Sequence, residues 1–161
     1  MTDTAARHGV ELVPVHILGL DLAAFGRTSE HMDELLREFS YLSLGSESDS
    51  VPRRLIDLVA ELRHAYTPVT AQTQRELDDA LARGDARIDL TFRVPPAARE
   101  VCIRLGELLG EADEYCRAGD LLTLETPPEA LAVRRWYLGQ FVAQIDGEPP
   151  TPWPEARPAP S

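Results

Sequence analysis

Residues 126–146 read TPPEALAVRRWYLGQFVAQID, and this stretch predicts the helix around which the rest of the chain is arranged. Thr126 can cap the first turn, Glu129 three residues later completes a capping box, and Gly147 provides the stop. Pro127 suits the first helical position, where a missing N–H costs nothing. Apolar side chains recur at helical spacing over a broad stripe: Leu131, Val133, Trp136, Tyr137, Leu138, Phe141, Val142 and Ile145. We therefore expect this helix to lie among other helices or against a partner.

Two segments upstream are expected to be β-strands. Residues 87–94 alternate strictly, with Ile88, Leu90, Phe92 and Val94 on one side of the chain. Residues 10–18 are rich in β-branched side chains, and Pro14 places them at a sheet edge. Because an isolated strand cannot satisfy its backbone, the two segments should pair with each other. Residues 121–124 are either a third strand or an extended connector.

The remaining periodic segments are expected to be helices. One runs from Asp21, or from Thr28 if Gly26 weakens its start, to about residue 44. A second is capped by Ser50 and closed by Thr67-Pro68, and a short third one follows, from Thr70 or Thr73 to Gly84. A fourth begins at Pro95-Pro96 and stops at Gly119. The predicted fold is thus mainly α: an irregular bundle of about five helices with a small sheet of two or three strands.

The chain is expected to contain one globular domain, at residues 10–147. A loose leader precedes it at residues 1–9, and a proline-rich tail follows at residues 148–161. The tail contains Trp153, an aromatic residue that would pack on the body or dock on a partner.

Composition narrows the possible partners and the compartment. The formal net charge is −11 and the pI is about 4.7, which disfavours nucleic acid and anionic membranes as main partners. Lysine is absent, so lysine nucleophiles and the P-loop lysine are not available. The two cysteines, Cys102 and Cys116, are too far apart on one helix to form a disulfide with each other. With no signal-peptide or membrane-span pattern, we expect a cytoplasmic protein.

Several groups of polar residues are candidates for chemical sites. Glu61-Leu-Arg-His64 has the Glu-x-x-His spacing of di-iron bundles, but the second such motif is missing, so neither a metal nor a cofactor is expected. His31 lies next to acidic residues and is the alternative site, a phosphoryl acceptor in a phosphotransfer-like bundle. The carboxylates of the segment 107–114 are expected to form a solvated face: Glu107, Glu111, Asp113 and Glu114.

The strongest candidate for a binding surface combines arginine with large aromatic side chains, as interface hot spots do. It comprises Arg134, Arg135, Trp136, Tyr137 and Trp153. The alternative is that the aromatic residues fill the core while the arginines pair with nearby acids.

Three segments together resemble a known group of proteins: HMDELLREF at 31–39, IDLTFRVPP at 88–96 and RRWYLGQFVAQIDGEPPTPW at 134–153. They are similar to small uncharacterised helical proteins of actinobacteria that are encoded near anti-sigma-factor kinases, STAS-domain proteins and PP2C-type phosphatases. The resemblance implies a role in partner-switching signalling and transfers no catalytic motif. The sequence therefore favours a non-enzymatic regulatory module that binds another protein. The alternatives left open are the His31 phosphotransfer bundle and a metal-dependent enzyme.

Overall fold

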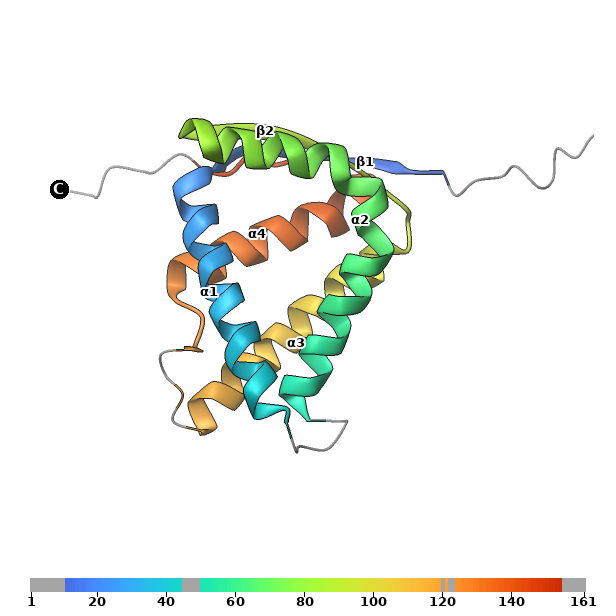
Figure 1. Ribbon diagram of the computed structural model, residues 1–161. Coiled ribbons are helices and arrows are strands. Elements are labelled where there is room, and N and C mark those ends of the chain that lie inside the picture. Colours follow the sequence, from blue (N-terminus) through green and yellow to red (C-terminus); the bar gives the residue numbers. More distant parts are fainter. Residues whose placement is uncertain (1–10, 45–49, 120, 122–123, 155–161) are drawn as a thin grey trace, which may run out of the picture.

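A computed structural model describes residues 11–44, 50–119, 121 and 124–154. In chain order the elements are β1 (Val13–Asp21), α1 (Leu22–Leu42), α2 (Val51–Arg83), β2 (Arg87–Val94), α3 (Ala98–Ala118) and α4 (Pro128–Ile145) (Figure 1). The mainly α architecture with a small sheet is confirmed. None of the described helices combines the length and apolar character that a membrane span requires. The expected leader at 1–9, most of the polar loop after residue 44 and the end of the tail lie outside the described residues.

The expectation of five helices is wrong, because the second and third of them form one helix of 33 residues. Pro68, which was expected to end a helix, lies inside α2 and removes one backbone donor there. Figure 1 shows α2 bending sharply along its course, as a proline-containing helix does. Both ends of α2 lie where the sequence predicts them. The Ser50 side chain accepts a hydrogen bond from the Arg53 amide, and Gly84 ends the helix in a left-handed conformation.

The sheet joins the two predicted strands as an antiparallel pair, from Val13 opposite Val94 to Asp21 opposite Arg87. The register shifts by one residue between Ile17 and Leu20, where Gly19 has a φ of 67°. This bulge changes which side chains of β1 point inward, so that Leu20 joins Val15 and Ile17 in the core. The strand therefore continues past Gly19, which was expected to end it, and α1 begins directly after Asp21.

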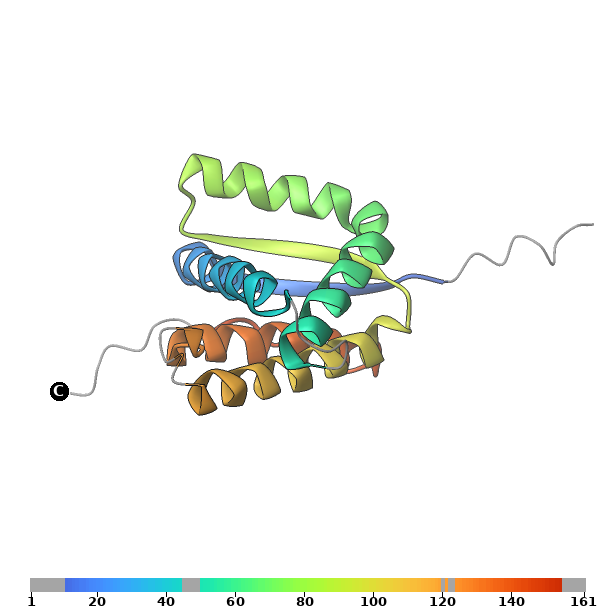
Figure 2. The same cartoon turned by 60° about the horizontal axis from the view of Figure 1, so that its bottom comes forward.

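Side chains of two helices form hydrogen bonds with backbone groups at the outer edges of this two-stranded sheet. Gln144 of α4 accepts a hydrogen bond from the His16 amide (2.7 Å) and donates one to the His16 carbonyl (2.8 Å). On β2, the Thr73 hydroxyl of α2 donates to the Thr91 carbonyl at 2.7 Å. Figure 2 shows the arrangement that permits this, with α2 beside β2 on one side and α4 beside β1 on the other. Both edges are thus covered, which disfavours pairing with another strand at these positions.

Two clusters of buried side chains hold the elements together. The first lies on the inner face of the sheet and includes residues of α2 and α4: Val15, Ile17, Leu20, Leu77, Leu90, Phe92 and Phe141. The second joins the far ends of α1, α2 and α3: Leu35, Phe39, Leu55, Leu58, Leu108, Leu109 and Cys116. The bend in α2 lets its two halves contribute to different clusters.

The start of α4 differs from the expected capping box. Pro127 occupies the N-cap position and no side chain caps the helix. The Thr126 hydroxyl instead donates to Asp113 of α3, and Glu129 pairs with Arg27 of α1. Both side chains therefore bind neighbouring helices. Of the connector 121–124, residues 122–123 lie outside the described part, and the sheet seen in the described part has two strands.

Candidate functional site

The five residues predicted to form a binding surface lie in different environments. Arg134 is largely enclosed, Tyr137 packs among aromatic side chains, and Trp136 and Trp153 meet at the surface. Arg135 is exposed. The structure thus brings Trp136 and Trp153 together, whereas Arg134 and Tyr137 point into the body of the molecule.

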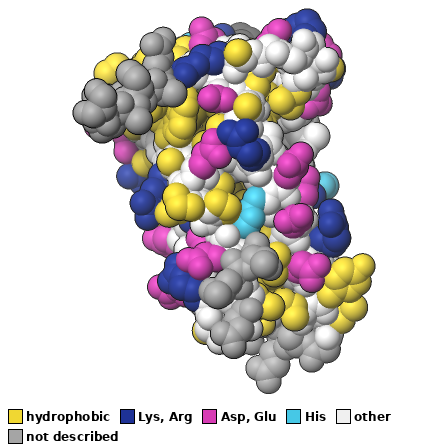
Figure 3. Space-filling model, turned by 90° about the vertical axis from the view of Figure 1, so that its left-hand side faces the viewer, with side chains coloured by type: hydrophobic (Ala, Val, Ile, Leu, Met, Phe, Trp, Pro, Cys, Tyr) yellow, Lys and Arg dark blue, Asp and Glu magenta, His cyan; other side chains and the backbone are white. Residues whose placement is uncertain are grey.

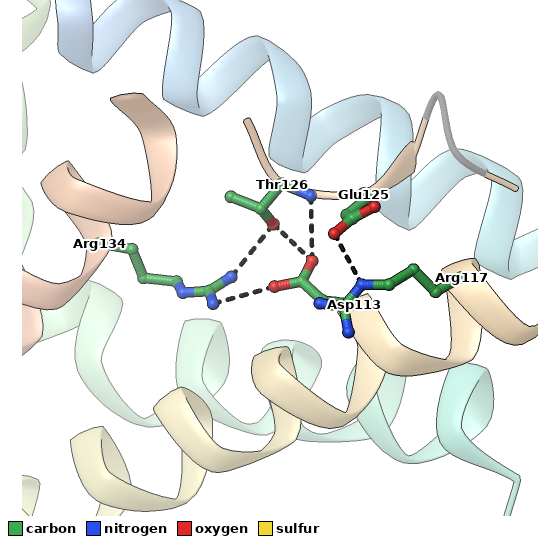
Figure 4. A network of polar contacts seen from close by, with 5 residues as sticks. All are labelled: Asp113, Arg117, Glu125, Thr126 and Arg134. Atoms are coloured by element: carbon green, nitrogen blue, oxygen red, sulfur yellow. Dashed lines mark hydrogen bonds and ion pairs between the residues drawn. The ribbon is translucent and has the colours of Figure 1, made fainter. Parts of the chain in front are cut away.

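Arg134 belongs to a buried polar network between α3 and α4 (Figure 4). Its guanidinium donates to Asp113 at 3.1 Å and to the Thr126 hydroxyl at 3.2 Å. Asp113 also accepts hydrogen bonds from the Thr126 amide (3.1 Å) and hydroxyl (2.6 Å). The Arg134 and Asp113 side chains are 12% and 9% exposed, so this pair differs from an ordinary surface salt bridge. It ties the segment before α4 to α3.

The acidic face predicted for residues 107–114 is therefore wrong at Asp113. Glu107, Glu111 and Glu114 are exposed, and Glu111 pairs with Arg54 of α2 at 3.2 Å. Asp113 points the other way, toward α4, because it lies on the opposite side of α3. No pattern in the local sequence distinguishes it, since its partners come from the connector and from α4.

Tyr137 lies within a cluster of aromatic rings contributed by three elements. Its ring centroid is 6.2 Å from that of Phe25, 6.3 Å from Phe92 and 5.5 Å from Phe141. Burial raises the pKa of the Tyr137 hydroxyl well above its ordinary value, and the nearby Cys102 thiol adds to the rise. Tyr137 thus has the role that the sequence allowed as an alternative, that of a core residue.

Trp136 and Trp153 form an edge-to-face pair, with ring centroids 5.2 Å apart and an angle of 65° between the planes. The Trp136 indole N–H donates to the Thr151 carbonyl at 2.9 Å. The Trp153 amide donates to the Leu18 carbonyl of β1, also at 2.9 Å. The chain after α4 is therefore held against the body on two sides. Both rings remain partly exposed, which leaves apolar area available to a partner.

His31 lies on α1 and its Nε2 atom is buried without a hydrogen-bond partner. A phosphoryl acceptor must meet its donor in solution, so the burial of this nitrogen does not favour phosphotransfer through it.

The face of the molecule that carries α1 shows acidic and basic side chains mixed with small apolar areas (Figure 3).

The candidate metal ligands and the cysteines do not form a common site. A carboxylate oxygen of Glu61 lies 3.7 Å from a guanidinium nitrogen of Arg104, and His64 is exposed one turn later on α2. Among the described residues, no group of three or more His, Cys, Asp or Glu side chains is arranged to hold a metal ion. Cys102 and Cys116 are both on α3 as free thiols, and burial raises the pKa of Cys102 to about 11.

Comparison with known proteins adds no relative: no family model matches the chain, and neither the curated proteins nor the solved structures contain a significant match.

Proposed function

We propose that the protein is a non-enzymatic regulatory module that binds another protein in a bacterial partner-switching circuit. Its partner would be an anti-sigma-factor kinase, a STAS-domain protein or a PP2C-type phosphatase, the classes that the sequence resemblance implies. The observation that carries the protein-binding proposal is the partly exposed pair Trp136–Trp153, together with the exposed Arg135, which precedes Trp136 on α4. Tryptophan and arginine are the residue types most enriched among interface hot spots.

The geometry of the pair suits binding because the rings are fixed before a partner arrives. Two hydrogen bonds anchor the segment, one from the Trp136 indole to Thr151 and one from the Trp153 amide to Leu18. A side chain that is already immobilised loses less conformational entropy on association. Arg134 and Tyr137 contribute indirectly, since they fix α4 and with it the position of the surface residues.

The net charge of −11 adds a second argument, about the chemistry of the partner. A strongly acidic protein is attracted to a basic surface and repelled by an acidic one. We therefore expect the bound partner to present basic side chains around an apolar centre, and we expect the association rate to fall as salt rises.

The test is a binding measurement with purified kinase, STAS-domain and phosphatase candidates from the same organism. Trp153→Ala and Arg135→Ala should each weaken binding at least tenfold, because each removes a large side chain that the proposed surface presents to the partner. Arg63→Ala and Tyr41→Ala are matched controls, since both residues are exposed and lie on α2 and α1. Failure of all three candidate classes to bind would reject the circuit. Binding that survives the double variant Trp153→Ala/Arg135→Ala would reject this surface.

A further inference from the structure

A cavity lies between α1, α3 and α4, apart from the tryptophan surface. Its volume is about 210 Å³ and its walls are mostly apolar, formed mainly by Phe25, Met32, Leu105, Leu109, Val133 and Tyr137. The cavity is partly open to solvent; for comparison of size, an enclosed engineered apolar cavity of about 150 Å³ binds benzene. The space between these helices is therefore large enough for one aromatic ring with a small substituent.

The lining favours a ring over a flexible chain. The Phe25 and Tyr137 rings are 6.2 Å apart with 36° between their planes, and both line the cavity. Aromatic rings pack well at such offsets against a third ring, and the thioether of Met32 adapts to irregular shapes and interacts favourably with ring edges.

His31 also lines this cavity, and its Nε2 atom is buried without a partner, so an occupant reaches this atom after a rotation of the imidazole ring. Its Nε2 is the one buried side-chain nitrogen or oxygen in the described part of the chain that has no hydrogen bond. Buried polar atoms are almost always paired, so an orphan of this kind indicates a missing partner. A hydroxyl group can fill that role for either neutral tautomer of histidine, because a hydroxyl both donates and accepts.

The charge of the walls argues for a neutral occupant. Arg134 reaches the cavity, but its guanidinium is already bound to Asp113 and Thr126. An anionic ligand would have to compete with the Asp113 carboxylate for that guanidinium, or lie in an apolar space without a counter-ion, which is costly.

We propose that this cavity binds a small neutral aromatic hydroxyl compound. The ring lies among Phe25, Met32 and Tyr137, and the hydroxyl forms a hydrogen bond with His31 Nε2. The inference stands apart from the proposed protein-binding surface, since neither depends on the other.

The probes are 4-methylphenol and toluene, which fill similar volumes and differ in the hydroxyl group, together with 4-methylbenzoate as the charged analogue. Binding to the full chain is measured by calorimetry and by ¹H–¹⁵N NMR of the histidine side chains. We expect 4-methylphenol to bind about tenfold more tightly than toluene, the ratio that one buried hydrogen bond gives, and to shift the His31 ring resonances. The benzoate should bind more weakly than either.

Two variants separate this site from non-specific binding. His31→Leu should bring the ratio between 4-methylphenol and toluene close to one, because it removes the polar partner and keeps the apolar walls. Ala130→Leu should reduce the affinity for both probes at least tenfold by filling the cavity. Leu121→Phe, which narrows a separate cavity lined by Glu34, Leu121 and Leu124 that shares no residue with the first, is the matched control and should leave binding unchanged.

Each variant is used after circular dichroism shows that it is folded. The proposal is overturned by equal affinities of the wild type for 4-methylphenol and toluene. It is also overturned by binding that survives Ala130→Leu, or by the absence of binding at millimolar 4-methylphenol.

Discussion

Replacing Arg134 with methionine tests whether the network in Figure 4 holds α4 in place. The substitution keeps much of the side-chain volume and removes the positive charge next to Asp113. Asp113 would then be a buried carboxylate with hydrogen bonds from Thr126 and no counter-ion. Breaking a buried pair in this way costs about 3–5 kcal/mol, and for a chain of this size that lowers the Tm by roughly 10 °C. Urea unfolding measures the free energy and thermal unfolding the Tm, each followed by tryptophan fluorescence and circular dichroism.

The salt bridge between Arg27 and Glu129 provides the matched control, because it also connects α4 to another helix but lies in solvent. Its side chains are 58% and 49% exposed, against 12% and 9% for Arg134 and Asp113. Arg27→Met should therefore change the unfolding midpoint much less than Arg134→Met does. The double variant Asp113→Leu/Arg134→Met should be less destabilised than either single variant, since no unpaired charge remains. Equal effects of Arg27→Met and Arg134→Met would refute the reasoning from burial.

Three further outcomes follow from the structure. Gln144→Met removes both hydrogen bonds to the His16 backbone, so it should cost about 1–3 kcal/mol in urea unfolding and speed hydrogen exchange of the His16 amide; an unchanged exchange rate would contradict this. Gly19→Ala places a side chain at a φ of 67°, which should cost about 1–2 kcal/mol although the nearest atoms leave room for a Cβ; wild-type stability would show that the bulge relaxes. Burial raises the pKa of Cys102 from 9.0 to about 11, so the unfolded chain loses this proton first and stability should fall between about pH 9 and pH 11, by up to roughly 2–3 kcal/mol. Cys102→Ala should flatten that part of the profile, and an equally steep decline in this variant would exclude the thiol as its cause.

The sequence was sufficient to predict elements whose signals are local. The strict alternation of residues 87–94 and the helical spacing of the apolar side chains in residues 126–146 produced β2 and α4. Pairing of the two strands also followed, because no other strong strand signal was present.

The helix end predicted at Pro68 is wrong for a physical reason. A helix interior accommodates proline by bending, and packing on both sides of Pro68, against α3 and against β2, holds α2 together across the lost hydrogen bond.

The site was harder to predict because its residues interact across elements. Thr126 and Glu129 match a capping box, yet both bind side chains that are far away in sequence, Asp113 and Arg27. The double hydrogen bond from Gln144 to β1 likewise spans 128 residues. Spacing rules report what a side chain can do within its own helix. They carry no information on a better partner that tertiary packing brings within reach.

The breadth of the apolar stripe on α4 has an explanation in these contacts. The helix packs against α1, α3 and β1, and through Trp136 it also meets the segment that follows it. Little of its circumference is left for solvent, apart from a strip that includes Arg135 and Gly139. One side of α4 therefore borders the cavity next to His31, while Trp136 presents the aromatic pair at the surface. An occupant of the cavity would contact Val133 and Tyr137, which lie before and after the segment 134–136 in the sequence. If α4 moves as a rigid body, filling the cavity changes the position of the Trp136–Trp153 pair, and binding of an aromatic hydroxyl compound should alter partner affinity in wild-type protein but not in Ala130→Leu, whose cavity is already filled.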